Sequence, residues 1–231
     1  MATSTVEDYL KRILLEEQRG DGPPVSPGRI AAALAVAPGT VTAMLKALTA
    51  SGLINYEPYT GAGLTDAGCK LALHVLRRHR LIELFLVQVM GMDWSEVHDE
   101  AERLEHAVSD LLITRIDEML GHPAVDPHGD PIPTPGGEVE QPQLPSLVSC
   151  GTGRPLRVAR VLDQNPAFLQ LVEREGLKPG RPIEVRSRDR AADTVVIRRG
   201  DGGLLSLGFR AASKIEVEGS HGGRPLQEAG P

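Results

Sequence analysis

The sequence contains few aromatic residues and few cysteines. Aromatic residues make up 3% of the 231 residues, so we expect cores built from aliphatic side chains. The two cysteines, Cys69 and Cys150, are too few for a disulfide framework. No apolar run approaches the roughly 18 residues of a membrane span, and the first residues lack the charged-then-apolar pattern of a signal peptide. These absences predict a cytoplasmic protein.

Basic residues are scarce in the middle of the chain. Residues 81–150 hold 2 basic and 14 acidic side chains, a net charge of −12 within a total of −6. The flanking segments are positive: residues 1–80 carry 9 basic and 7 acidic side chains, and residues 151–231 carry 14 and 10. Because the acidity is confined to one segment, the flanking segments can face phosphate.

The first 64 residues have the pattern of a winged helix. VEDYLKRILLEEQ predicts a first helix, Ser26 caps a second helix that ends near Leu34, and Pro38 starts a third. LINYEPYTGAGLT predicts two short strands around a turn, as in a wing. The small, polar face of the third helix and the cap of the second predict a DNA contact surface. Its residues are Ser26, Pro38, Gly39, Thr40, Thr42 and Lys46.

The rest of the chain predicts two long helices, a linker and a small barrel. The helices are expected over Thr65–Met90 and Ser95–Leu120, and the proline- and glycine-rich segment 121–147 is expected to be a linker. Five short strands follow, with one helical insertion, NPAFLQLVEREG, after the first. The strands are LRVARVL, PIEVRSR, TVVIRR, LLSLGF and KIEVE. The predicted fold class is therefore α+β.

Residues 98–106, HDEAERLEH, place two histidines and four carboxylates within nine residues. On one helix, His98, Glu102 and His106 recur at i, i+4 and i+8, and Glu105 lies beside them. All four flank the apolar seam of the predicted helix, so we do not expect them to point to open water. Carboxylates brought together in this way cost free energy unless a proton or a cation intervenes.

The preceding helix offers a second pair, His79 and Glu83, again four residues apart. A helix with Asp, Glu and His is usually a solvated face, but the second pair and the shortage of basic residues favour a metal site. Oxygen and nitrogen ligands without a thiolate favour Mn²⁺, with Fe²⁺ as the second choice, over structural Zn²⁺. The ion stays open, because Zn²⁺, Co²⁺ and Ni²⁺ bind such ligands more tightly.

Together these features resemble the diphtheria-toxin-repressor family of metal-dependent transcriptional repressors. The resemblance is to its manganese-dependent transport regulators that carry an SH3-like (FeoA-type) C-terminal domain. The strings that carry it are VEDYL, GLTDAG, RRHRLIELFL, VHDEAERLEH and DPHGDPIP. It implies a winged-helix domain over 1–72, a helical metal-binding and dimerisation domain over 73–140, a linker over 141–153 and an SH3-like domain over 154–218. The terminal residues 219–231 are expected to form a disordered tail.

The resemblance implies a primary metal site on two helices. Asp8 matches the aspartate of the family's first helix, and Glu102, Glu105 and His106 match ligands on the later helix. Position 102 separates the subfamilies, since iron-responsive members have cysteine there and manganese-responsive members have glutamate. Lys11 is a departure, because regulators without the barrel have an acidic residue there that completes a two-metal cluster. We therefore do not expect that cluster.

A second metal site is also implied by the resemblance. Its six ligands would be His79, Glu83, His98, Asp126, His128 and Asp163. Asp126 stands in the DPHG segment where cysteine is common, which keeps an anionic but harder ligand. For the barrel ligand, Gln164 is the alternative to Asp163.

The resemblance implies a repressor of metal-uptake genes. We expect it to bind a palindromic operator as a homodimer when Mn²⁺ or Fe²⁺ joins the first helix to the later one. Bound metal would also cancel negative charge near DNA. One alternative is a metal-independent winged-helix DNA-binding protein. The other, a metalloenzyme, is disfavoured because Glu-x-x-His pairs, zinc-protease motifs, phosphate loops and nucleophile elbows are missing. The chain is not expected to be an enzyme.

Overall fold

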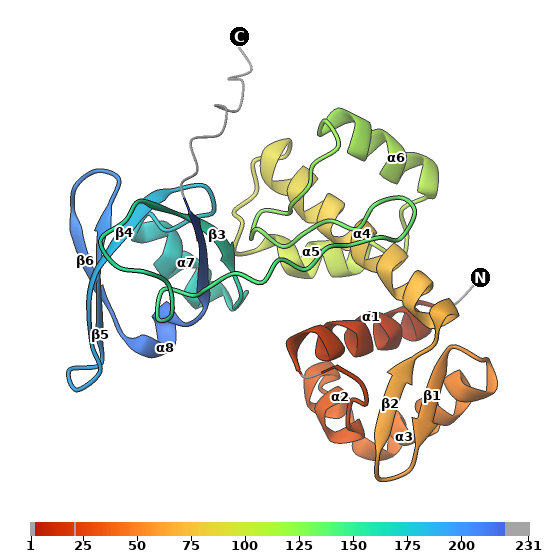
Figure 1. Ribbon diagram of the computed structural model, residues 1–231. Helices are drawn as coiled ribbons and strands as arrows, with labels where there is room; N and C mark the ends of the chain where they lie inside the picture. Colours follow the sequence, from red (N-terminus) through yellow and green to blue (C-terminus); the bar gives the residue numbers. More distant parts are fainter. Residues whose placement is uncertain (1–2, 21, 220–231) are drawn as a thin grey trace. The chain divides into compact units, whose positions relative to one another are not determined.

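The computed structural model describes residues 3–20 and 22–219. These residues form two compact units (Figure 1). The first unit comprises described residues within 1–85, 99–124 and 132–140. The second comprises residues 86–98, 125–131 and the described residues from 141 onward.

The first unit begins with a helix-turn-helix. Its helices are α1 (Ser4–Arg19), α2 (Pro27–Leu34) and α3 (Pro38–Ala50). The Ser26 hydroxyl accepts a hydrogen bond from the Arg29 amide at 3.3 Å and caps α2, as the sequence predicts. Among the described residues, no single helix is long and apolar enough to cross a membrane. The pair α2 and α3 passes that test only together, and it bends by 113°, which is typical of a helix-turn-helix.

A β-hairpin completes the winged helix. β1 (Ile54–Glu57) pairs antiparallel with β2 (Gly61–Leu64), and the two strands flank the predicted tip. Val25 forms an isolated antiparallel bridge with Ala62 of β2, because its amide donates to the Ala62 carbonyl at 2.7 Å and the Ala62 amide donates to the Val25 carbonyl at 2.9 Å. The predicted wing is thereby confirmed, and it is joined to the residue before the cap of α2.

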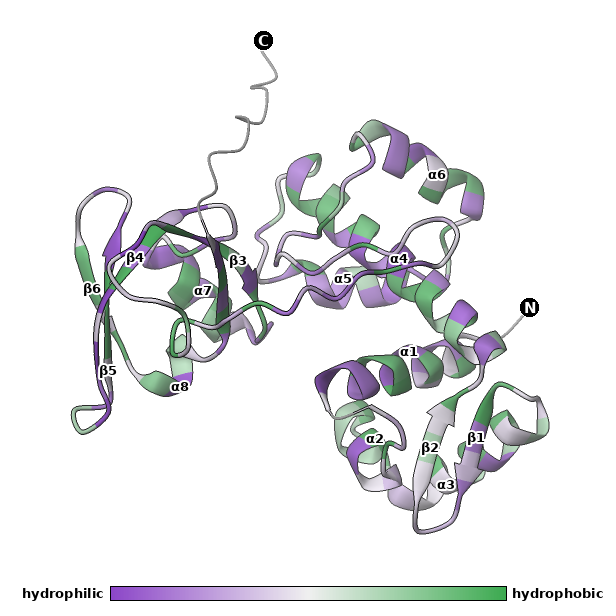
Figure 2. Cartoon of the chain, in the orientation of Figure 1, coloured by the Kyte–Doolittle hydropathy of each residue, from purple (hydrophilic) through white to green (hydrophobic). Residues whose placement is uncertain are grey.

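The three helices and the wing bury one aliphatic core. The apolar side chains of α1 form one core with those of α2, α3 and the hairpin, and α1 carries both polar and apolar residues, as its mixed colours in Figure 2 show. The largest fully buried side chains of this core are Leu10, Ile13, Ile30, Leu45, Leu48 and Ile54. Because α1 and α3 share this core, the position of α1 fixes the position of α3.

Three further helices follow the wing: α4 (Asp66–Gln88), α5 (Val97–Leu104) and α6 (Asp110–Met119). The Thr65 hydroxyl accepts a hydrogen bond from the Gly68 amide at 3.2 Å and caps the start of α4. The prediction of a single helix over Ser95–Leu120 is wrong. The chain breaks after α5 and restarts at Ser109, whose hydroxyl accepts from the Leu112 amide and caps α6.

The apolar seam expected along that helix is also only partly buried. Val97 and Ala101 are fully buried, as expected, but Leu104 is 37% exposed and Leu111 is 70% exposed. The break reorients α6, so residues that continue the pattern in the sequence do not continue it in space.

The second unit is a five-stranded antiparallel sheet in the order β6-β5-β4-β3-β7 (Figure 1). The strands are β3 (Leu156–Val161), β4 (Pro182–Asp189), β5 (Thr194–Arg199), β6 (Leu204–Leu207) and β7 (Ile215–Gly219). The helix α7 (Pro166–Arg174) lies between the first two in sequence, so the predicted strands and insertion are confirmed. The short helix α8 (Phe209–Ala212) was not predicted, because LLSLGF continues the apolar pattern of a strand.

Part of the predicted linker is ordered. Val125 bridges Pro131, and the Asp126 amide donates to the Asp130 carbonyl at 2.9 Å. The domain boundaries given above stay a prediction. Apart from Gly219, the predicted tail lies outside the described residues.

The start of α4 leaves no room for a side chain at Gly68. A Cβ at this position would lie 1.9 Å from the Leu53 carbonyl oxygen, which is backbone and cannot move alone. We expect Gly68→Ala to destabilise the protein by about 1–3 kcal/mol, as overpacking does. Denaturant unfolding followed by circular dichroism measures this.

Gly39 is the matched control, since it lies in the first turn of α3 with nothing within 4 Å of its Cβ position. Gly39→Ala should be neutral or stabilising by up to about 1 kcal/mol. Equal stabilities of the two variants would contradict the close approach at Gly68.

Candidate metal centre

HDEAERLEH folds as α5 from its second residue onward, followed by the first residues of a turn. The helix ends at Leu104, and the Glu105 amide still donates to the Ala101 carbonyl at 2.9 Å. Glu105 and His106 therefore occupy the first positions of the turn, and the helical i, i+8 relation expected for His106 does not hold. Glu105 is fully buried, so its carboxylate needs partners inside the protein.

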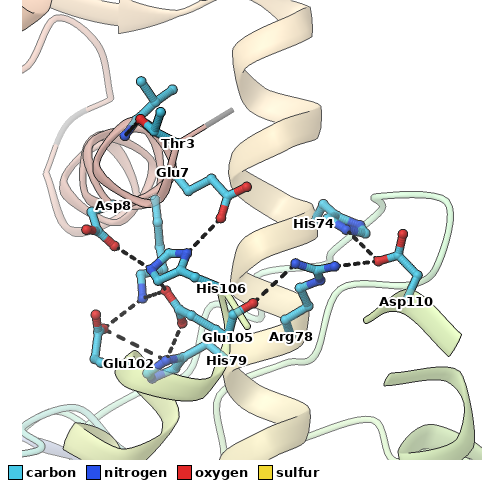
Figure 3. A network of polar contacts seen from close by, with 12 residues as sticks. Thr3, Glu7, Asp8, His74, Arg78, His79, Glu102, Glu105, His106 and Asp110 are labelled. Atoms are coloured by element: carbon cyan, nitrogen blue, oxygen red, sulfur yellow. Dashed lines mark hydrogen bonds and ion pairs between the residues drawn. The ribbon is translucent and has the colours of Figure 1, made fainter. Parts of the chain in front are cut away.

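The other residues of the centre are arranged around the Glu105 carboxylate (Figure 3). One carboxylate oxygen, Oε1, lies 2.6 Å from Lys11 Nζ and 3.3 Å from His106 Nε2. The other, Oε2, lies 2.7 Å from His79 Nδ1. Three elements thus meet at one carboxylate: α1, α4 and the turn after α5.

His106 joins this turn to α1. Its Nδ1 lies 2.7 Å from a Glu7 oxygen and its Nε2 lies 2.8 Å from Asp8 Oδ1, and both carboxylates point toward the ring in Figure 3. Burial lowers the pKa of His106, but the hydrogen bond with Glu7 and the charges of Glu105 and Asp8 outweigh it and raise that pKa. Burial is the largest influence on Asp8 and raises the pKa of its carboxyl.

His79 lies between two carboxylates. Its Nε2 is 2.9 Å from Glu83 Oε1, one turn along α4, and its Nδ1 faces Glu105. Burial acts to lower the pKa of His79, but the Glu83 charge and the hydrogen bonds to Glu105 and Glu83 raise it to about 9. The imidazole therefore sits in a strongly anionic environment.

These residues fit a divalent cation. Two groups of three can each bring one ligand atom within 4.8 Å of the others: Asp8, Glu105 and His106, and His79, Glu102 and Glu105. Every donor is a carboxylate oxygen or an imidazole nitrogen, which suits Mn²⁺ and Fe²⁺. The four residues predicted for the primary site, Asp8, Glu102, Glu105 and His106, are thus gathered around Glu105.

The ligands predicted for the second site divide between the two units. His79 and Glu83 lie on α4 in the first unit, and the other four residues belong to the second. This second site stays a prediction.

In the second unit, the DPHG segment is a tight turn. Asp126 Oδ1 accepts from the His128 amide at 2.8 Å, and the fully buried His128 ring stacks on Trp94 at 5.2 Å. Near the barrel, Asp163 forms an ion pair with Lys214. The Gln164 side chain instead donates to Asp130 at 3.2 Å, so Gln164 is hydrogen-bonded next to this turn.

The predicted DNA contacts lie together on the helix-turn-helix. Pro38, Gly39, Thr40 and Lys46 are exposed on α3, and Ser26 is exposed at the start of α2. Thr42 is half-buried and its hydroxyl donates to the Pro38 carbonyl at 3.1 Å.

Three partners of the centre were not predicted from the sequence. Glu7 contacts His106, Lys11 contacts Glu102 and Glu105, and Arg78 donates to the Glu105 carbonyl oxygen at 3.2 Å. The sequence pattern could have identified two of them. Glu7 and Lys11 are four residues apart on α1 and flank Asp8, so they lie on the same side of the helix as this predicted ligand.

Comparison with known proteins agrees with this arrangement. Family models match residues 1–62 (iron dependent repressor, N-terminal DNA binding domain), 65–134 (iron dependent repressor, metal binding and dimerisation domain) and 146–219 (FeoA domain). The iron-dependent repressor IdeR of Mycobacterium tuberculosis is 30% identical over 226 residues, covering 92% of this chain and 96% of IdeR.

Solved structures agree as well. A manganese-dependent transcriptional repressor in complex with manganese is 40% identical with a TM-score of 0.83, covering 92% of this chain and 98% of that one. The apo form of the manganese-activated repressor ScaR is 36% identical with a TM-score of 0.74, covering 92% and 99%. The chain belongs to the iron-dependent repressor family of metal-dependent transcriptional repressors, which includes the diphtheria toxin repressor.

Proposed function

We propose that this protein is a Mn²⁺-responsive repressor, with Fe²⁺ as the alternative ion, that binds a palindromic operator as a homodimer and represses metal-uptake genes. In this proposal it acts in the cytoplasm and is not an enzyme. The observation that carries the proposal is the buried Glu105 carboxylate, which faces Lys11 of α1 and His79 of α4. Glu102, which supplies a carboxylate and not a thiolate, favours Mn²⁺.

Asp8, Glu102, Glu105 and His106 would hold the ion. When bound, the ion supplies positive charge that carboxylates of α1 and α5 share. Asp8 then holds α1 against the turn after α5, while Tyr9, Leu10 and Ile13 of α1 pack in the core that also contains α3. Fixing α1 therefore fixes the recognition helix, and in a dimer it fixes the spacing of both recognition helices.

A dimer surface is available on α6 and the end of α5. Leu111, Leu112 and Met119 are 70%, 50% and 66% exposed, and Leu104 is 37% exposed. Exposed apolar side chains grouped on one helix commonly mark an interface. In this proposal a second copy of the chain covers them.

Operator binding should depend on metal and on Glu102. In fluorescence anisotropy with a labelled palindromic fragment from a metal-uptake promoter, Mn²⁺ should tighten binding by about 10- to 100-fold relative to chelated protein. Glu102→Ala should lose this effect. Equal binding with and without metal would leave a metal-independent DNA-binding protein.

Position 102 should influence the choice of ion. We expect Glu102→Cys to weaken Mn²⁺ binding by about tenfold relative to Zn²⁺, because a thiolate is a softer ligand. Competition with a fluorescent chelator measures both affinities. Asp99→Cys, an exposed position on α5, is the control and should keep the wild-type ratio. An unchanged ratio in Glu102→Cys would argue that Glu102 is not a ligand.

Dimerisation should depend on the apolar surface of α6. Leu111→Glu should weaken the dimer by about 2 kcal/mol or more, since a charge would be buried in the interface. Sedimentation equilibrium gives the dissociation constant. Leu204→Glu in the second unit, where the leucine is 68% exposed, should leave the dimer intact. Dissociation by Leu204→Glu alone would place the interface elsewhere.

A further inference from the structure

Lys11 is a buried cation at the centre of the cluster. It lies on α1, is 3% exposed, and its Nζ lies 2.7 Å from Glu102 Oε1 and 2.6 Å from Glu105 Oε1. Lysine is almost never buried to this extent unless it is paired. Glu102 and Glu105 are the two carboxylates that pair with it.

The ammonium contacts atoms that a metal ion would also use. Two groups of candidate ligands share Glu105, and the Lys11 ammonium donates to both carboxylates of one of them, the group of His79, Glu102 and Glu105. In the other group, made of Asp8, Glu105 and His106, Lys11 is hydrogen-bonded only to Glu105. A positive charge this close repels an incoming divalent cation and occupies the same lone pairs.

Lys11 also links two parts of the first unit. It comes from α1 of the winged helix, whereas Glu102 lies on α5 and Glu105 follows it. The ion pairs therefore hold α1 against the end of α5 through the protein's own charges.

We propose that Lys11 is an internal cation that competes with the metal ion for Glu102 and Glu105 and holds α1 against α5 in the metal-free protein. Lys11 then has two effects. It raises the Mn²⁺ concentration needed to fill the centre, and it keeps the two carboxylates positioned before metal arrives. This inference rests on the proposed metal response, but its test requires no DNA.

The first measurement is Mn²⁺ affinity of the full chain, read from the electron paramagnetic resonance signal of free Mn²⁺. The binding phase that Asp8→Ala removes is assigned to this centre. Lys11→Met should bind Mn²⁺ in that phase at least about tenfold more tightly than wild type, because a like charge within about 4 Å is gone. Lys11→Arg keeps the charge and should keep the weaker binding. Lys70→Met, at an exposed position on α4, is the matched control and should equal wild type.

The second measurement is hydrogen exchange of α1 in metal-free protein. The amides of residues 4–19 should exchange faster in Lys11→Met than in wild type, Lys11→Arg or Lys70→Met, and Mn²⁺ should restore their protection. A variant that merely disturbs packing would lose protection and Mn²⁺ affinity together. If Lys11 is a competing cation, Lys11→Met should lose protection of α1 but gain Mn²⁺ affinity.

Two results would overturn the proposal. One is a natively folded Lys11→Met, judged by circular dichroism, whose Mn²⁺ affinity equals or falls below that of wild type. The other is metal-free wild type whose α1 exchanges as fast as that of Lys11→Met. If the affinity and the hydrogen-exchange results are both as expected but operator binding does not respond to Mn²⁺, only the proposed function is contradicted.

Discussion

A fully buried carboxylate imposes the strongest constraint on the first unit. Glu105 has no exposed surface, and a buried charge is tolerated only where opposite charges and hydrogen-bond donors surround it. Its partners come from α1, from α4 and from its own turn. Satisfying one side chain therefore requires three separate elements to converge, and one of them belongs to the winged helix.

This convergence connects the chemistry of the centre to the DNA-binding surface. The face of α1 that carries Glu7, Asp8 and Lys11 meets the turn after α5, while its apolar face is part of the core that holds α3. The helix is thus polar toward the cluster and apolar toward the recognition helix. A change of charge in the cluster, on the polar face of α1, therefore affects the position of α3, which packs in the core with the apolar face.

Much of the fold could be predicted because it is encoded locally. Capping residues such as Ser26 and Thr65 and the alternation within the barrel strands identify their elements from a few neighbouring residues. The break before α6 could not be predicted, because Leu104 and Leu111 continue the apolar period across it. Their exposure suits a partner surface, and a single-chain pattern does not distinguish that from burial within the chain.

The cluster was predicted only in part, for a similar reason. The spacing of His79, Glu83, Glu102 and Glu105 identifies the candidate ligands within each helix. The contacts of Lys11 join residues 91 and 94 positions apart, and no local pattern predicts which cation will meet which carboxylate. The resemblance identified position 11 as a departure, but only the structure shows which carboxylates its ammonium contacts.

The bridge between Val25 and Ala62 has a consequence for how DNA is read. Val25 immediately precedes Ser26, the cap of α2, so two backbone hydrogen bonds tie the wing to the start of the helix-turn-helix. The hairpin is therefore held to the helix-turn-helix by backbone hydrogen bonds as well as by the shared core, which limits the span between the hairpin and the recognition helix. Duplexes whose groove dimensions match that span would be bound without distortion, and others would be deformed at a cost that depends on base sequence. Part of the operator preference would thus reside in base pairs that no side chain touches.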